Sequence, residues 1–341
     1  MKSYLTNRKQ RVRVNNNLSY WETIIAGVPQ GSILGPLLFN IFLNDLFLFV
    51  SNSHISNYAD DNTLYALGDN LKSVKENLLI DFQIVSDWFY ENYMVLNADK
   101  CHFMCLGKNT EEETFTFNEI VMKNSKEEKI LGVIIDNKLS FKSHIKELCK
   151  KASQKLAALS RLSGYLNSNE KQLVFNSVLK SQFNYCPLVW MFCSRNSNNM
   201  INKIHERALR VVQNDFNSDF DSLLQNSNDI CNHHRNIQTL LIEVFKIKNE
   251  LAPPIMDSMF TRRENPYNLR NFREFEMERK RTVKYGTESI TYRSPQLWDL
   301  LPEDLKQMSS LSQFKKEVRQ WICSNCPCRL CKRFVPNVGF L

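Results

Sequence analysis

Two adjacent aspartates, Asp60 and Asp61, are the residues of this sequence best suited to chemistry. They lie within residues 54–66, where alternating short runs predict a hairpin with a polar turn at Asp60-Asp61-Asn62. Adjacent carboxylates repel each other unless a cation lies between them. Two Mg²⁺ ions bound by such oxygens can activate a hydroxyl and stabilise departing pyrophosphate, which is nucleotidyl transfer. A solvated turn is the simpler alternative, because Asp and Asn are common turn residues.

Four closely spaced cysteines near the end of the chain form a second candidate site. Cys323, Cys326, Cys328 and Cys331 follow the spacing Cys-x2-Cys-x-Cys-x2-Cys. Four thiolates suit tetrahedral Zn²⁺. The single residue between the two pairs makes a tight loop, so a reduced tail without metal is the alternative.

A basic stretch at residues 262–284 contains eight Lys and Arg against four Glu, with Tyr267, Phe272 and Phe275 between them. This mixture suits phosphate contacts and base stacking. The alternative is a solvated surface with a few core aromatics. His233-His234 is interpreted as part of a capped turn, and His205 as a structural helix residue.

Hydrophobic periodicity predicts the elements that position these residues. Residues 1–26 read as one or two strands, and the turn at residues 27–32 allows Ser32 to cap the helix that follows. Helices are expected at 34–50, 70–92, 234–250 and 311–322, with a mostly helical region at 144–214. Further strands are expected around 101–107, 114–122 and 129–135.

Bulk properties favour a polyanion-binding protein. The chain has 341 residues, a net charge of +8 and a pI near 8.9. No apolar leader is present, and the most apolar run, residues 37–50, is too short to span a bilayer. We therefore expect a soluble protein without a membrane partner, located in the nucleus and/or cytoplasm.

An ordered set of motifs surrounds the aspartate pair. Residues 27–39 (GVPQGSILGPLLF) precede 58–61 (YADD), and 96–101 (LNADKC) and 131–136 (LGVIID) follow. Together they resemble the palm of non-LTR (LINE-type, jockey-like) retrotransposon reverse transcriptases. The resemblance continues through residues 181–188 (SQFNYCPL), 205–210 (HERALR) and 285–288 (YGTE), so it covers nearly the whole chain.

The resemblance implies an α+β fold in four parts. A partial polymerase palm, with an antiparallel sheet and helices, would occupy residues 1–143. A helical thumb-like region would follow at 144–215, then a helical and basic region at 216–322 and the Cys-rich tail at 323–341.

The resemblance also assigns roles to single residues. Asp60 and Asp61 would bind catalytic Mg²⁺ or Mn²⁺, and Tyr58 would lie beneath the primer end. Lys100 would lie near the triphosphate, and the strand beginning at residue 131 would be the primer grip. Contacts with the template and the incoming nucleotide would come from the loop residues Gly27, Pro29, Gln30 and Gly31. The implied partners are an RNA template, a DNA primer and dNTP.

One departure from the family pattern limits the expected activity. These polymerases need another metal-binding Asp on a strand before the glycine loop, yet residues 1–44 contain no Asp. Glu22 is the only acid among them, and Asp45 falls well along the following helix. We therefore expect negligible polymerase activity from this chain by itself.

Three interpretations remain open at this point. The chain is a reverse transcriptase fragment that is inactive alone, a non-catalytic nucleic-acid-binding remnant, or a piece of a longer active polymerase. Fold alone does not separate them.

Overall fold

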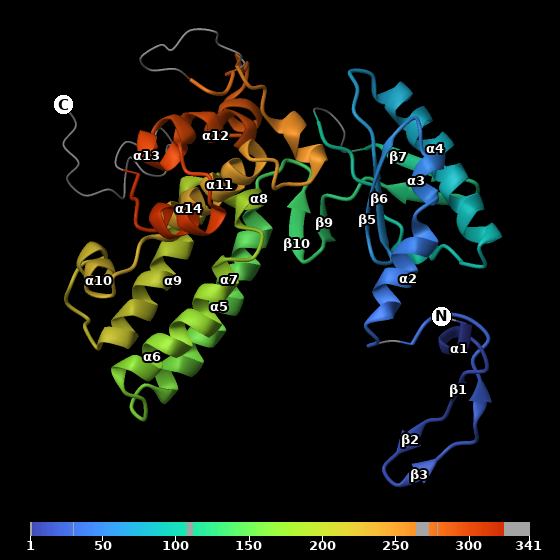
Figure 1. Ribbon diagram of the computed structural model, residues 1–341, viewed down its shortest axis with the longest axis horizontal. Coiled ribbons are helices and arrows are strands. Elements are labelled where there is room, and N and C mark those ends of the chain that lie inside the picture. The colour runs from blue at the N-terminus through green and yellow to red at the C-terminus, as the bar shows by residue number, and fades with distance from the viewer. Residues whose placement is uncertain (1, 30, 108–111, 264–272, 278, 324–341) are drawn as a thin grey trace. The chain divides into compact units, whose positions relative to one another are not determined.

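A computed structural model describes the chain except for residues 1, 30, 108–111, 264–272, 278 and 324–341 (Figure 1). The chain divides into two compact units, Met1–Ser125 and Lys126–Leu341. Each unit has a hydrophobic core of its own. No helix among the described residues is long and apolar enough to cross a membrane.

The described part of the first unit contains these elements, in chain order: α1 (Lys2–Leu5), β1 (Lys9–Gln10), β2 (Arg13–Val14), β3 (Asn17–Leu18), β4 (Glu22–Thr23), α2 (Leu34–Leu43), α3 (Leu46–Phe49), β5 (His54–Tyr58), β6 (Asp61–Tyr65), α4 (Leu71–Glu91), the 3-10 turn η1 (Ala98–Lys100), β7 (Thr114–Phe117) and β8 (Ile120–Lys123). The strands pair antiparallel as separate two-stranded sheets: β1 with β4, β2 with β3, β5 with β6 and β7 with β8.

Helix α4 forms the centre of the first unit. Its N-terminus is capped by Asn70, whose side chain accepts a hydrogen bond from the Lys72 amide, and Asn92 ends it as expected from the sequence. Phe82 on one side of α4 lies 4.6 Å, centroid to centroid, from Phe117 of β7. Elsewhere Val85 and Trp88 pack with Leu43 and Leu46. The helix thus packs against both β7 and the α2–α3 segment.

The described part of the second unit is mainly helical, with one hairpin at its start. Its elements are β9 (Glu127–Ile130), β10 (Val133–Asp136), α5 (Lys142–Leu162), α6 (Ser168–Val174), the π-helical η2 (Phe175–Lys180), α7 (Ser181–Phe183), α8 (Pro187–Trp190), α9 (Arg195–Gln213), α10 (Phe220–Asn226), α11 (Asn232–Lys248), η3 (Pro254–Met259), η4 (Val283–Thr287), α12 (Ile290–Asp299), α13 (Glu303–Lys306) and α14 (Leu311–Val318).

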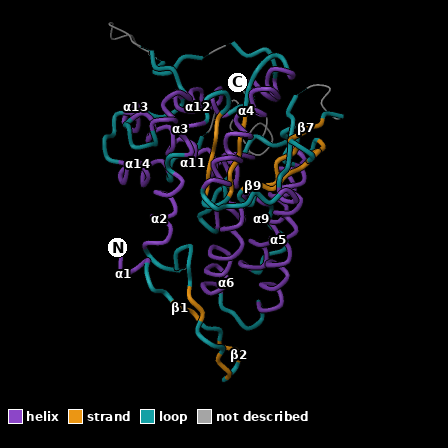
Figure 2. Tube along the Cα trace, turned by 90° about the vertical axis from the view of Figure 1, so that its right-hand side faces the viewer, coloured by secondary structure: helices purple, strands orange, loops and turns teal. Residues whose placement is uncertain are grey.

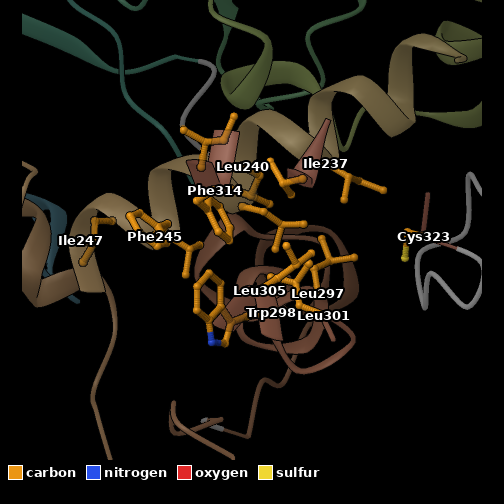
Figure 3. Packing of buried hydrophobic residues seen from close by; sticks show 14 of the residues in the cluster. Ile237, Leu240, Phe245, Ile247, Leu297, Trp298, Leu301, Leu305, Phe314 and Cys323 are labelled. Atoms are coloured by element: carbon orange, nitrogen blue, oxygen red, sulfur yellow. The ribbon is translucent and has the colours of Figure 1, made fainter. Parts of the chain in front are cut away.

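Two helical layers make up the second unit. Helices α5 and α9 run side by side (Figure 1 and Figure 2) and bury an apolar stripe of α5 that includes Ile145, Leu148 and Ala152. A separate core forms where α11, α12 and α14 meet, with Phe245, Trp298 and Phe314 at its middle (Figure 3). The rings of Phe245 and Phe314 stack with centroids 4.2 Å apart.

Most helices lie where periodicity predicts them, whereas several strands differ. The stretch 114–122 is a hairpin rather than one strand, because Asn118 adopts a left-handed φ of 50° and turns the chain. The stretch 129–135 is likewise a hairpin, turning at Leu131 and Gly132. Residues 101–107 contribute only an isolated bridge from Phe103 to Asn124. The fold is therefore mixed α/β with small antiparallel sheets, and the four-part domain scheme stays a prediction.

Candidate functional site

The aspartate pair lies at the tip of the β5–β6 hairpin. Tyr58 pairs with Asp61 across the strands, so the turn consists of Ala59 and Asp60. The turn therefore falls one residue earlier than the sequence predicted, and Asp61 is the first residue of β6. Both aspartates are exposed, and the Tyr58 side chain is 67% exposed beside them. The hairpin thus presents two carboxylates and a phenol ring to solvent at one edge.

Two asparagines hold this turn in shape: Asn62, which was part of the predicted turn, and Asn57, which the sequence interpretation missed. The Asn57 amide donates to the Asn62 side-chain oxygen and to the Ala59 carbonyl, both at 2.8 Å. The Asn62 amide donates to the Asp60 carbonyl at 3.3 Å. These bonds satisfy turn carbonyls that the ladder leaves unpaired. Their signal in the sequence is a pair of Asn placed symmetrically about the Ala59–Asp60 turn, each two residues from it.

Ala59 carries backbone strain at this tip. Its φ of 54° lies in the left-handed region, which costs an L-residue about 1–2 kcal/mol. The first position of a two-residue hairpin turn commonly requires such a φ, and Gly is the residue that adopts it freely. A strained residue directly before the candidate ligands is consistent with a functional role.

Replacing Ala59 with glycine is expected to stabilise the first unit by about 0.5–1 kcal/mol, because glycine relieves the strain but loses more backbone freedom on folding. Ala66→Gly, just after β6 and not among the residues with positive φ, is the matched control and should destabilise instead. Urea unfolding, with hydrogen exchange to separate the first unit from the second, measures both. A loss of stability in Ala59→Gly would show that the left-handed turn is not a source of strain.

The rest of the hairpin is packed onto the first unit's core. Ile55 and Leu64, paired across the strands, lie against the cluster that contains Leu46 and Trp88. This contact sets the position of the hairpin relative to α2 and α4.

A buried carboxylate fixes the chain just before β5. Asp81 of α4 is fully buried and accepts hydrogen bonds from the amides of Asn52 and Ser53 at 2.9 and 2.5 Å, and from the Ser53 hydroxyl at 2.7 Å. Burial acts to raise the pKa of Asp81, but these hydrogen bonds outweigh it and hold the pKa below its usual value. Asp81 lies on the same helix face as the buried Val85 and Trp88. An acidic residue on an otherwise apolar helix face is the feature of the sequence that could have indicated a buried hydrogen-bond partner.

The predicted glycine loop lies before α2 and is anchored at both ends. Gly27 and Gly31 adopt φ of 78° and 75°, which explains glycine at these positions. Arg8 donates to the carbonyl oxygens of Ala26 and Gly27. Gln30, the remaining polar residue of the predicted template contact, lies outside the described residues.

Ser32 bonds the first turn of α2 as expected of a cap, although the N-cap position itself is Ile33. Its hydroxyl accepts from the Gly35 amide at 3.0 Å and from the Tyr4 phenol at 2.6 Å, and donates to the Pro29 carbonyl at 2.8 Å. A Cβ on Gly35 would lie 2.9 Å from the Ser32 hydroxyl oxygen and 3.2 Å from the Pro29 carbonyl. The loop therefore closes on the helix start only because residue 35 is glycine.

Two further residues singled out in the sequence, Lys100 and Glu22, are exposed in the first unit. Lys100 is exposed at the end of η1, and no hydrogen bond or ion pair joins it to either aspartate. Glu22 is exposed on β4, the strand entering the loop, as expected. Among the described residues, no group of three or more His, Cys, Asp and Glu is placed to hold a metal. Asp60 and Asp61 suit Mg²⁺ as oxygen donors but provide only part of a ligand set.

The cysteine tail lies mostly outside the described residues, which include Cys323 but not Cys326, Cys328 or Cys331. Cys323 is 2% exposed and belongs to the α11–α14 core, at its edge in Figure 3. This burial among apolar groups does not support zinc binding. Phe275 of the basic stretch is 1% exposed in the same core, so it is not available to stack on bases.

A buried ion cluster around Asp229 includes one of the histidines of the second unit. Asp229, before α11, lies 2.9 Å from the Lys180 ammonium, 2.7 Å from the Arg235 guanidinium and 3.3 Å from His205 Nε2. Burial lowers the pKa of His205, so the ring is neutral near pH 7. His205 is thus structural, as predicted. His233 and His234 are buried in the first turn of α11, next to its N-cap Cys231.

Comparisons with known proteins cover the first unit and extend into the second. The family described as "Reverse transcriptase (RNA-dependent DNA polymerase)" matches residues 1–135. The chain is 25% identical over 225 residues to the "Probable RNA-directed DNA polymerase from transposon BS" of Drosophila melanogaster. It is 27% identical over 224 residues to the "RNA-directed DNA polymerase from mobile element jockey" of the same species.

Each of these two matches covers 62% of this chain, and they cover 25% and 24% of the respective relatives. The chain therefore spans about a quarter of the length of the curated relatives it matches. The "Probable RNA-directed DNA polymerase from transposon X-element" of Drosophila melanogaster is 24% identical over 222 residues. No solved structure matches the chain significantly.

Proposed function

Because residues 1–135 are a reverse transcriptase domain of the jockey-like, non-LTR retrotransposon type, we propose that Asp60 and Asp61 belong to a two-metal nucleotidyl-transfer site. The substrates would be an RNA template, a DNA primer and dNTP. The 341-residue chain by itself would lack turnover, because residues 1–44 supply no aspartate to complete the ligand set.

The observation that carries this proposal is the shape of the β5–β6 tip. A strained two-residue turn, held by Asn57 and Asn62, exposes two adjacent carboxylates, the first of them two residues after Tyr58. A left-handed φ is usual at the first position of a two-residue turn, but alanine in place of glycine there is strained, and two asparagines bonded to the turn carbonyls hold it in that shape. When bound there, divalent cations would activate the primer hydroxyl and neutralise charge on the phosphates.

The roles of the surrounding residues follow from their positions. Tyr58, exposed beside the aspartates, would support the primer end. The loop with Gly27, Pro29, Gln30 and Gly31 would contact the template and the nucleotide, since positive-φ glycines let backbone approach a ligand closely. Lys100, exposed at the end of η1, would aid pyrophosphate departure as a cation near the triphosphate.

The proposed thumb is the α5–α9 layer of the second unit. One face of α5 is buried, and the opposite face exposes cations suited to duplex phosphates. These exposed side chains are Lys142, Lys146, Lys150 and Lys151.

A primer-extension assay tests the catalytic part of this proposal. Purified chain with Mg²⁺ or Mn²⁺, dNTP and a recessed RNA–DNA hybrid is expected to give no extension above background, because removal of a metal ligand costs several orders of magnitude in rate. Clear extension that disappears in Asp60→Ala would contradict the expected inactivity while supporting the metal role of Asp60.

Hybrid binding tests the nucleic-acid part. Fluorescence anisotropy should show binding that weakens with rising salt, and Lys146→Ala/Lys150→Ala should lower the magnitude of the salt slope by about 2. Lys315→Ala/Lys316→Ala on α14 removes the same charge and should leave the slope nearly unchanged. Absence of hybrid binding at low salt would contradict both the polymerase proposal and its alternative, a non-catalytic nucleic-acid-binding remnant. Hybrid binding without primer extension is expected under both the polymerase proposal and this alternative.

The zinc site at Cys323, Cys326, Cys328 and Cys331 remains a separate prediction. Metal analysis of purified chain decides it. A zinc content near one per chain that is lost in Cys326→Ser/Cys328→Ser would support the site, and zinc-free wild type would end it.

A further inference from the structure

The β9–β10 hairpin belongs to the helical unit and turns at an unfavourable residue. Ile130 pairs with Val133, so Leu131 and Gly132 form the turn, with φ of 46° and 84°. Glycine adopts such a φ freely, whereas leucine does not. Two four-residue strands are also too short to be stable alone. The hairpin therefore needs contacts from the helices to keep its turn in one conformation.

The first contact comes from Tyr185, between α7 and α8. Its hydroxyl donates to the Leu131 carbonyl oxygen. Its ring lies 3.4–3.7 Å from where a Cβ on Gly132 would stand, so ring and hydroxyl together cover the turn. The backbone of Tyr185 is itself held in place, because the indole of buried Trp190 donates a hydrogen bond to the Tyr185 carbonyl at 3.2 Å.

The second contact lies at the other end of the hairpin. Tyr285 of η4 donates its hydroxyl to the Lys138 carbonyl at 3.0 Å, in the loop that joins β10 to α5. The same loop is closed by Asp136, whose carboxylate accepts from the amides of Ser140 and Phe141 at 2.8 and 2.6 Å. The two tyrosines thus hold the tip and the base of one hairpin, from segments 100 residues apart in the sequence.

We propose that Tyr185 and Tyr285 are positioning residues that fix the Leu131–Gly132 turn for contact with the primer terminus. This rests on the proposed function, in which that strand is the primer grip. Leu131 is 43% exposed, so its side chain is accessible to a ligand while its carbonyl oxygen accepts the hydrogen bond from Tyr185. The motifs at residues 181–188 and 285–288, to which the sequence analysis assigned no role, would then both serve to position the Leu131–Gly132 turn.

The test uses hydroxyl deletions in the full chain. Tyr185→Phe and Tyr285→Phe remove one hydrogen bond each and keep the ring, and Tyr165→Phe, 89% exposed in the second unit, is the matched control. Amide hydrogen exchange at residues 130–134 reports the hairpin. Anisotropy with a recessed primer–template hybrid and a blunt hybrid of equal length reports recognition of the primer end.

Tyr185→Phe should speed exchange at the turn about two- to tenfold, the change in opening equilibrium expected from one lost hydrogen bond. The preference for the recessed hybrid should fall by a similar factor, with blunt-hybrid affinity unchanged. Tyr285→Phe should act in the same direction, and Tyr165→Phe should change neither measurement.

Each of the other outcomes contradicts a specific part of the proposal. Unchanged exchange in Tyr185→Phe means that the hydroxyl does not hold the turn. Faster exchange with an unchanged recessed-end preference means that the contact is only structural. A wild-type chain that binds neither hybrid contradicts the proposed function, and a chain that binds both equally removes the primer-grip role; the exchange measurement still judges the hairpin contact in both cases.

Discussion

Replacing Asp229 with asparagine is expected to lower the free energy of unfolding of the Lys126–Leu341 unit by about 3–5 kcal/mol, because removal of one partner leaves the other charges buried and uncompensated. The Asp229 side chain is only 6% exposed, and Lys180 and Arg235 approach it at 2.9 and 2.7 Å. An asparagine side chain is neutral and would turn a donor toward one of these cations. The partners come from η2, α9 and α11, so the loss affects three helical segments at once.

Urea denaturation, with hydrogen exchange to separate the two units, measures this effect. Asp257→Asn, an exposed aspartate in η3, is the matched control and should change stability by less than about 0.5 kcal/mol. Equal losses of unfolding free energy in the two variants would show that the ion cluster does not stabilise the fold more than an exposed aspartate does.

The pH dependence of the Asp229 effect has a definite sign. Burial acts to raise the pKa of Asp229, but His205, Arg235 and Lys180 hold it well below the usual value. A depressed pKa stabilises the fold above the unfolded-state value of about 3.9, and this contribution is lost as pH falls through the folded-state value. The advantage of wild type over Asp229→Asn should therefore be constant near neutrality and shrink below about pH 4.

His205 adds a second pH effect in the same direction. Its folded-state pKa is lowered, so the unfolded chain binds a proton first, near pH 6.5. Stability of the second unit should therefore begin to fall as the pH drops below about 6.5.

The second large effect is expected in the first unit, where Asp81→Asn should cost about 2–4 kcal/mol. Three donors from Asn52 and Ser53 converge on one carboxylate oxygen of Asp81. An asparagine with its amide nitrogen there would face donors with a donor, and the opposite rotamer would place the nitrogen against the Asn52 side-chain amide. The turn that leads into β5 would loosen, and the aspartate tip would lose its fixed base.

The control for this substitution lies two turns along the same helix. Asp87 of α4 is exposed and accepts only a surface hydrogen bond from Gln83, so Asp87→Asn should change stability by less than about 0.5 kcal/mol. Exchange rates at residues 54–58 should rise in Asp81→Asn and stay unchanged in Asp87→Asn. Unchanged exchange rates in both variants would show that the buried Asp81 carboxylate does not hold the hairpin in place.

The sequence predicted those elements whose periodicity is set by burial. Residues such as Leu148, Ala152 and Leu159 recur at helical spacing, and all three are buried on α5. The hairpin with the aspartate pair was also predicted, because strand alternation on both sides brackets a polar turn. The reverse transcriptase family was recognised from motif order and agrees with the match over residues 1–135.

The parts that escaped prediction depend on backbone conformation or on distant partners. The turns at Asn118 and Leu131 require left-handed φ, which side-chain periodicity does not report. Asp81 and Asp229 acquire their partners through tertiary contacts, from 28 to 30 and from 6 to 49 residues away. A buried charge on an apolar face can therefore be noticed in a sequence, but its partner becomes visible only in three dimensions.

The junction between Ser125 and Lys126 decides how this polypeptide can be cut for expression or recombined with its relatives. A piece ending at residue 143 would carry β9 and β10 away from α5 and from Tyr185, leaving a short ribbon with exposed edges that invite aggregation. Pieces that meet at residue 125 keep the ribbon with its helices. Chimeras between jockey-like elements should therefore exchange Lys126 and everything after it as one cassette.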